Sequence, residues 1–180
     1  ISFKMPVMKP ITGNLFFVGL MGAGKTTLGR QLADHLQYPF YDSDNVICQR
    51  TGVNIPTIFE IEGEQGFRQR ESMVIQELTA MDNVVLATGG GAVLREENRH
   101  CLRNRGTVIY LHVLPEILFE RTKYDKNRPL LQVADPLSKF RELYETRHEL
   151  YCQTAHMVLE VGKSGCQTTL NRIFELVGRK

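Results

Sequence analysis

The sequence has little net charge, no block of like charges and no long apolar stretch near its beginning. Its 22 lysines and arginines are nearly balanced by 20 acidic residues, which leaves a net charge of +2. Nucleic-acid binders carry a basic patch or stripe, so we expect no nucleic-acid partner. The first residues resemble neither a signal peptide nor a membrane anchor, so we also expect no membrane association.

Cysteines are few and scattered, and they form neither a C-x-x-C pair nor a metal-ligand cluster. The four are Cys48, Cys101, Cys152 and Cys166. This pattern favours free thiols in a reducing compartment, and we expect a cytoplasmic protein. The sequence also lacks internal repeats and low-complexity segments.

The size and composition are those of one globular domain. The chain has 180 residues, of which 42% are apolar and 23% are charged, and domains cluster around ~100–150 residues. We expect a single domain over residues 14–180 and a monomer. Residues 1–13, which contain two prolines, are predicted to form a flexible N-terminal tail.

The most informative stretch is residues 19–26, GLMGAGKT, which matches the phosphate-binding pattern G-x-x-x-x-G-K-[ST] without a gap. An apolar run at 15–18 precedes it as a predicted buried strand. A helical pattern with leucines three and four residues apart follows it. A strand, a glycine loop and a helix are the context that this motif requires, although a glycine-rich turn without a ligand is the simpler alternative.

The residue types of this loop suit phosphate chemistry. Glycines let successive backbone N–H groups converge on phosphate oxygens at the positive end of a helix. Lys25 is expected to reach the β- and γ-phosphates, and the Thr26 hydroxyl to bind Mg²⁺. The predicted ATP-binding residues of this segment are Gly22, Ala23, Gly24, Lys25, Thr26 and Thr27.

Two further sets of residues follow predicted strands. Asp42 and Asp44 end the strand predicted at 39–44, and alternation places both on one face near the phosphate loop. The alternative is that one of them caps a helix that starts at Asn45. The glycines at 89–91 follow the strand predicted at 83–87, and they favour close backbone approach to a ligand over a passive turn.

The remaining pattern predicts an α/β fold with a parallel sheet and helices on both faces. Further strands are predicted at 107–112 and 157–161, and helices at 45–50, 56–63, 64–81, 95–105, from 115, at 136–153 and after 165. Ligands of such sheets bind beyond the carboxyl ends of the strands, so one cleft can collect all three sets. The polar segment at 124–135 is either a lid or a surface connection.

With these residues in place, the chain resembles a shikimate kinase, one of the phosphate-loop kinases related to nucleoside-monophosphate kinases. Besides the phosphate loop, the motifs that carry the resemblance are YDSD at 41–44, EGEQGFRQRE at 62–71, ATGGG at 87–91, RPLL at 128–131 and RHELY at 147–151. The resemblance covers residues 14–178. It implies a three-layer phosphate-loop kinase fold, with a five-stranded parallel sheet in the order 2-3-1-4-5 and a mobile lid at about 123–135.

The resemblance also implies a reaction, in which ATP and Mg²⁺ are used to phosphorylate the 3-hydroxyl of shikimate on the route to chorismate and the aromatic amino acids. Lys25, Asp44 and Arg128 would be catalytic, with Asp44 binding the attacking hydroxyl and orienting or deprotonating it. Asp42 would help Thr26 to position Mg²⁺, through water.

The remaining roles follow from the same resemblance. Arg68 and Arg147 would hold the substrate carboxylate, and Glu71 would hold an arginine in place. By spacing alone, Arg68 and Glu71 are only a pair on a helix surface. The substrate would also contact Gly89, Gly90 and Gly91, through the Gly90 N–H above all. Arg121 would lie against adenine, and Arg128 would reach the transferring phosphate from the lid.

Two alternatives remain at this stage. A gluconate kinase of the same fold would explain the phosphate loop and the lid, but not the matched aspartates, arginines and glycines. A family member that binds nucleotide and a protein partner without catalysis would have no reason to retain the whole acceptor site. Turnover that depends on an acceptor separates the second alternative from an enzyme.

Overall fold

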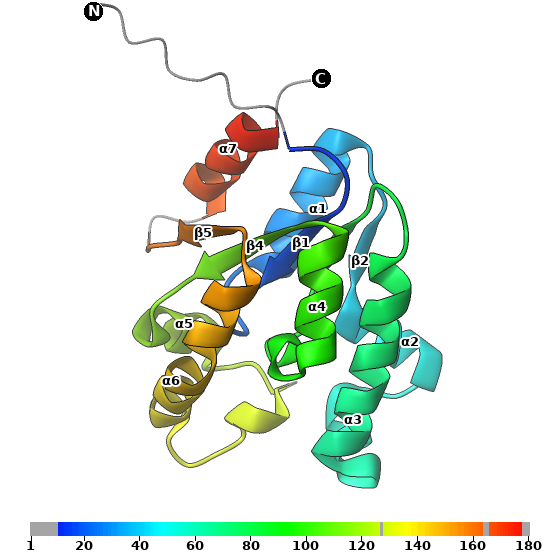
Figure 1. The fold of residues 1–180 in the computed structure, drawn as a ribbon. Helices are drawn as coiled ribbons and strands as arrows, with labels where there is room; N and C mark the ends of the chain where they lie inside the picture. The colour runs from blue at the N-terminus through cyan, green and yellow to red at the C-terminus, as the bar shows by residue number, and fades with distance from the viewer. Residues whose placement is uncertain (1–10, 127, 164–165, 178–180) are drawn as a thin grey trace, which may run out of the picture.

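The structure, a computed structural model, describes residues 11–126, 128–163 and 166–177. Most of the predicted tail, up to residue 10, therefore lies outside the described residues. Ile11 packs against the core, and its N–H donates to the carbonyl oxygen of Leu176 at 3.2 Å. Both ends of the described chain thus lie on the same side of the molecule (Figure 1).

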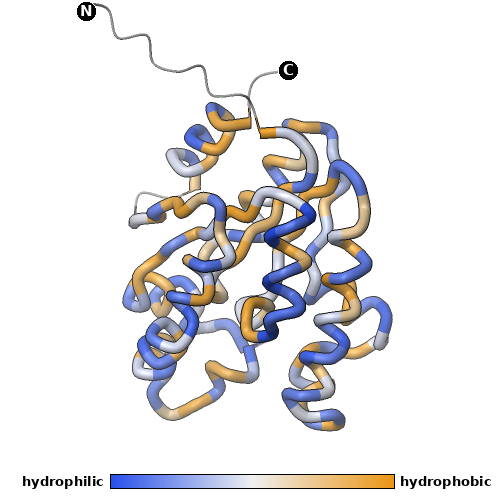
Figure 2. The backbone as a smooth tube through the Cα atoms, viewed as in Figure 1, coloured by the Kyte–Doolittle hydropathy of each residue, from blue (hydrophilic) through white to orange (hydrophobic). Residues whose placement is uncertain are grey.

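Five parallel strands form one sheet in the order β2-β3-β1-β4-β5, which confirms the predicted topology. The strands are β1 (Leu15–Val18), β2 (Phe40–Asp42), β3 (Val85–Ala87), β4 (Thr107–His112) and β5 (Met157–Glu160). Every residue of β1 and β3 is buried, because helices cover both faces of the centre of the sheet. Figure 2 shows these apolar strands inside the molecule.

The helices form the two outer layers (Figure 1). They are α1 (Lys25–Leu36), α2 (Ser43–Thr51), α3 (Ile55–Thr79), α4 (Glu96–Arg105), α5 (Pro115–Thr122), α6 (Pro136–Thr154) and α7 (Cys166–Val177), with short 3-10 helices η1 (Ala92–Leu94) and η2 (Pro129–Leu131). On one face α1 packs with α7, and on the other α4 packs between α3 and α6. Among the described residues, none of the helices has the length and hydropathy needed to cross a membrane.

The helices predicted at 56–63 and 64–81 are the two halves of α3. They meet at Gly63, whose φ of 72° and ψ of 178° are not helical. A positive φ of this kind favours glycine. The boundary predicted between residues 63 and 64 therefore lies at the observed kink. The first half begins at the Asn54 cap, whose side chain accepts a hydrogen bond from the Thr57 N–H at 3.0 Å.

The strand predicted at 39–44 was wrong in its second half. β2 ends at Asp42, and Asp44 lies in the first turn of α2. Asp42 causes this early turn, because its Oδ1 accepts from the Asn45 N–H at 3.1 Å and caps a helix that begins at Ser43. The two carboxylates are therefore placed by a helix start and not by strand alternation.

Candidate active site

The segments that follow β1, β2 and β3 meet at one end of the sheet, where two adjoining pockets open. The phosphate-loop pocket, with an empty volume of about 820 Å³, contains Lys25 and Thr26. The arginine pocket, of about 440 Å³, contains Arg68 and Arg147. Residues that line both pockets are Met21, Asp44, Gly89, Gly90 and Arg128. A group bound in one pocket can therefore reach a group bound in the other.

The phosphate loop has the backbone that its glycines allow. Gly19, Gly22 and Gly24 all have positive φ values, of 146°, 81° and 102°. Gly22 also has no room for a side chain, because a Cβ there would lie 2.5 Å from Cγ2 of Thr122 on α5. Ala23 is buried, does not line the pocket, and donates its N–H to the Leu20 carbonyl at 3.2 Å. The other predicted residues of this segment, Gly22, Gly24, Lys25, Thr26 and Thr27, line the pocket.

Lys25 is the buried cation of this loop. Its Nζ donates to the carbonyl oxygens of Gly19 at 2.6 Å and Leu20 at 2.8 Å. Burial, with a further contribution from the positive charge of Arg128, lowers the pKa of Lys25 to about 7. A phosphate group in the pocket would restore its charge, since a nearby anion favours the ammonium form.

Thr26 and Asp42 form a pair of oxygen ligands at the start of α1. The Thr26 hydroxyl donates to Oδ2 of Asp42 at 2.6 Å, while the other oxygen of Asp42 caps α2. The cap confirms one of the predicted alternatives for Asp42, and its contact with Thr26 places it next to the phosphate loop. Mg²⁺ is usually bound through one or two carboxylates together with substrate phosphates and water, and this donor set fits it. Within the described ranges no group of three or more His, Cys, Asp or Glu could hold a metal, so phosphates and water would supply the other ligands.

Asp44 lies at the junction of the two pockets. Its Oδ2 is 3.7 Å from Nη1 of Arg128, whereas its Oδ1 is buried and has no hydrogen-bond partner. Burial raises the pKa of Asp44, the charge of Asp42 adds to that effect, and Arg128 and Lys25 oppose it. An oxygen left in this state is suited to accept a hydrogen bond from a hydroxyl group and to draw its proton.

Arg68 and Arg147 are both buried, with exposed fractions of 6% and 4%, so neither is a surface residue of its helix. Nη1 of Arg68 donates to Oε1 of Glu71 at 2.8 Å, and Nη1 of Arg147 has no hydrogen-bond partner. Burial raises the pKa of Glu71 to about 6, although Arg68 opposes the shift. Nη2 of Arg68 also lies 3.3 Å from Oε1 of Glu64. The buried donors left without a partner are Nε of Arg68 and Nη1 of Arg147, and such guanidinium donors fit a carboxylate ligand.

The glycines at 89–91 are needed for space rather than for backbone conformation. None of them has a positive φ. A Cβ on Gly91 would lie 2.3–2.5 Å from the guanidinium atoms of Arg68. A Cβ on Gly89 would lie 2.7 Å from Oδ1 of Asp44 and 2.8 Å from Oε2 of Glu71. The loop is therefore in direct contact with Arg68, Glu71 and Asp44, and close approach of its backbone to a ligand stays a prediction.

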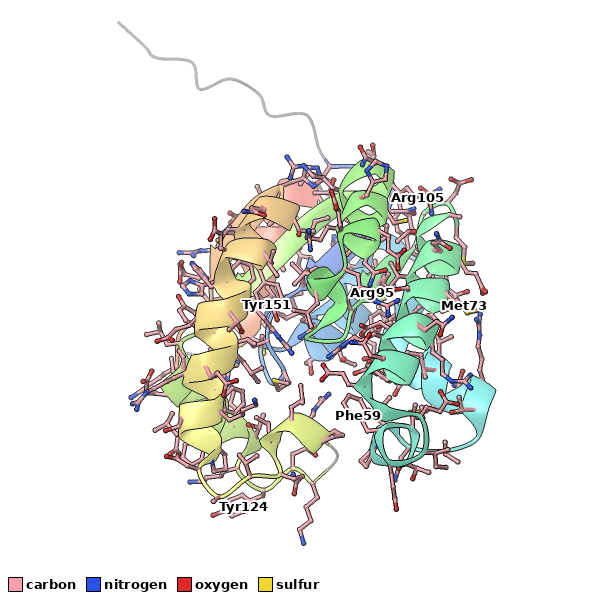
Figure 3. The ribbon with its side chains drawn as sticks, turned by 60° about the horizontal axis from the view of Figure 1, so that its bottom comes forward. Phe59, Met73, Arg95, Arg105, Tyr124 and Tyr151 are labelled. Carbon is pink, nitrogen blue, oxygen red and sulfur yellow. The ribbon has the colours of Figure 1, made fainter. Side chains whose placement is uncertain are left out.

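The apolar side of the arginine pocket was not predicted from the sequence. It is lined by Ile55, Phe59 and Phe67 of α3, Met21, Pro129 and Leu130. Figure 3 shows Phe59 on α3 and Tyr151 on α6 on opposite sides of this end of the molecule. Nothing in the sequence separates these apolar residues from core positions, because Phe67 fits the buried stripe of α3 as well.

Two arginines reach the phosphate-loop pocket from the segments around α5. Nη1 of Arg121 donates to the Gly22 carbonyl at 3.2 Å, and Nη2 donates to the Gly162 carbonyl at 3.3 Å. Arg121 thus lies between the phosphate loop and the turn after β5. Arg128 comes from the irregular segment after α5, where its Nε lies 3.3 Å from Oδ2 of Asp125.

Comparisons with known proteins show which family this chain resembles. The family model described as "Shikimate kinase" matches residues 21–177. The chain is 55% identical over 172 residues to a shikimate kinase of Neisseria meningitidis serogroup C (strain 053442), covering 96% of this chain and 100% of that one. A solved shikimate kinase from Acinetobacter baumannii in complex with shikimate is 48% identical, with a TM-score of 0.90 over 92% of this chain and 93% of that one. A gluconokinase from Sinorhizobium meliloti 1021, at 20% identity and a TM-score of 0.56 over 92% of this chain and 90% of that one, shares the fold alone.

Proposed function

This chain belongs to the shikimate kinase family, and on that premise we propose how its two pockets carry out the reaction. It is a phosphotransferase that uses ATP to phosphorylate shikimate in aromatic biosynthesis. The observation that carries the proposed mechanism is the position of Asp44. This residue lines both pockets and has a buried oxygen without a partner.

The arginine pocket is the proposed shikimate site. Arg68 and Arg147 bind the carboxylate, and Glu71 holds Arg68 in place through their 2.8 Å hydrogen bond. Charge-assisted hydrogen bonds contribute about 1.5–3 kcal/mol each, so two arginines suffice to select an anionic acceptor. The glycines at 89–91 let the backbone approach the substrate, and the Gly90 N–H is the proposed donor. A neutral sugar would leave both buried cations without an anion.

Asp44 is the proposed catalytic base. Its Oδ1 accepts a hydrogen bond from the 3-hydroxyl, aligns that oxygen with the γ-phosphate, and takes its proton as transfer proceeds. Burial raises the pKa of this carboxyl, which makes it a stronger base than an exposed aspartate. The nearby Arg128 and Lys25 stabilise the negative charge on the transferring group.

The phosphate-loop pocket is the proposed nucleotide site. Gly22, Gly24, Lys25, Thr26 and Thr27 surround the phosphates, Lys25 binds the β- and γ-phosphates, and Arg121 lies against adenine. Thr26 and Asp42 would hold Mg²⁺, the latter through water, and the ion would supply positive charge against the phosphates. The pair fits that ion because both oxygens already lie at the pocket wall.

The segment at 123–135 is the proposed lid. It brings Arg128, Pro129 and Leu130 into the arginine pocket, so its closure over both ligands would exclude water and deliver Arg128 to the transferring phosphate. We further propose that the protein is a cytoplasmic monomer without nucleic-acid or membrane partners.

The test is ADP release by the purified protein with ATP and Mg²⁺, with and without shikimate, and with gluconate as the control acceptor. We expect release that depends on shikimate and not on gluconate. ATP binding without acceptor-dependent release would instead support the non-catalytic binder.

A further inference from the structure

Tyr151 links the arginine helix to the glycine loop. Its hydroxyl, on the buried side of α6, donates a hydrogen bond to the carbonyl oxygen of Gly90. Arg147 lies one helical turn earlier on the same buried side, and both residues are almost fully buried. Burial raises the pKa of Tyr151 to about 12, although Arg147 opposes the shift, so the hydroxyl remains a donor at neutral pH.

The loop at 89–91 is held at every carbonyl oxygen. The Gly89 oxygen accepts from the Ala92 N–H and the Gly91 oxygen from the Leu94 N–H, both at 3.1 Å. The Gly89 N–H donates to Oγ of Ser43 at 3.0 Å. The N–H groups of Gly90 and Gly91, by contrast, have no acceptor in the part of the chain that the structure describes. They are the two donors of the loop that remain for a ligand.

The Tyr151 contact decides how one of these donors points. The peptide between Gly90 and Gly91 is planar and trans, so its N–H points opposite to its carbonyl group. Since Tyr151 holds the carbonyl oxygen, it turns the Gly91 N–H away from α6. No other side chain in the described residues bonds this peptide, and glycines on both sides leave it free to rotate without the hydroxyl.

If Tyr151 had a purely structural role, the packing of its aromatic ring would be sufficient and its hydroxyl would not be needed. Tyr151 packs against Tyr110 with 4.9 Å between ring centroids, and the Tyr110 hydroxyl is hydrogen-bonded to Nδ1 of His148 at 2.9 Å. This packing fills the core whether or not Tyr151 carries a hydroxyl. The ring and the hydroxyl can therefore be separated by experiment, because phenylalanine keeps one and loses the other.

We propose that Tyr151 is a positioning residue for shikimate, because its hydroxyl fixes the Gly90–Gly91 peptide so that the Gly91 N–H, together with the Gly90 N–H and Arg147, presents one preformed binding site. This inference rests on the proposed function of the arginine pocket. Tyr151 does not touch the reacting atoms, and it acts through the loop and through Arg147, whose side chain also interacts with its hydroxyl. Its loss should therefore weaken binding of the acceptor and leave the nucleotide side intact.

The experiment compares Tyr151→Phe with Tyr144→Phe in steady-state kinetics. Tyr144 is a matched control because it lies on the same helix and its hydroxyl is hydrogen-bonded to Nε2 of His112 at 2.7 Å, away from both pockets. For Tyr151→Phe we expect the KM for shikimate to rise about five- to tenfold, the size of one lost hydrogen bond, with an unchanged KM for ATP. For Tyr144→Phe we expect both KM values to stay unchanged.

A structural role predicts a different result. If the hydroxyl only stabilises the fold, Tyr151→Phe lowers Tm and the amount of active enzyme, while its KM for shikimate equals that of the unmodified protein. That result would overturn the inference, and so would an equal rise in KM for both variants. Since KM does not depend on the fraction of folded enzyme, a loss of stability leaves the test valid. Failure of the proposed function is separate, because the unmodified protein would then show no shikimate-dependent ADP release.

Discussion

Nη1 of Arg128 lies 3.7 Å from Oδ2 of Asp44, where the phosphate-loop pocket meets the arginine pocket. The two residues come from different parts of the chain, since Asp44 begins α2 and Arg128 follows α5. Their contact leaves the other oxygen of Asp44 without a partner. The base and the cation of the proposed transfer are thus already next to each other before any ligand is considered.

Arg147→Ala should raise the KM for shikimate about 10- to 100-fold, because it removes one of the proposed charge-assisted hydrogen bonds to the carboxylate. The KM for ATP should change little. Arg141→Ala is the control, since Arg141 lies on the same helix but is exposed and pairs with the exposed Glu116 at 3.2 Å. Steady-state kinetics of both variants check this, and similar KM values for shikimate would argue against a carboxylate site at Arg147.

Gly91→Ala should weaken shikimate binding in the same direction as removal of the Arg68 side chain, although Arg68 itself is not substituted. A Cβ at this position would overlap the guanidinium group, which must then move away from Glu71. The backbone can accommodate alanine, because the φ of Gly91 is −95°. We expect a folded protein by circular dichroism with a KM for shikimate raised at least about fivefold. An unchanged KM would show that the position of Arg68 is unimportant for binding.

Nucleotide binding should take up a proton at pH 8.5. With a pKa of about 7, Lys25 is mostly neutral at that pH in the free protein, and bound phosphates favour its charged form. The affinity for ADP should therefore fall as pH rises above 7, because binding then requires proton uptake. Titration calorimetry in two buffers of different ionisation enthalpy measures this uptake. Equal heats in both buffers would mean that Lys25 does not change its charge on binding.

Local patterns were sufficient to predict the phosphate loop and most of the elements. Lys25 and Thr26 belong to one contiguous motif, and the glycine conformations that it requires are all present. The strand at 107–112, the helix that begins at Pro115 and the break at Gly63 were also confirmed. These features depend on residues close together in the chain, which is why a pattern can detect them.

The arginine pocket depends on contacts between distant residues, and local patterns could not predict it. By spacing, Arg68 looked like an exposed partner of Glu71, yet both are buried because α3 packs against the loop at 89–91. The resemblance to a family, not the spacing, singled out Arg68 and Arg147. The position of Asp44 was predicted wrongly because α2, which Asp42 caps, begins at Ser43, two residues before the predicted helix start at Asn45.

Asp44→Asn is the most direct test of the proposed mechanism. Asparagine keeps the shape of the side chain and a hydrogen-bonding oxygen, but it cannot take the proton of the 3-hydroxyl. At saturating shikimate and ATP, we expect ADP release to fall at least about 100-fold, with a nearly unchanged dissociation constant for ATP. Turnover that stays close to that of the unmodified protein would contradict the role of Asp44 as the catalytic base.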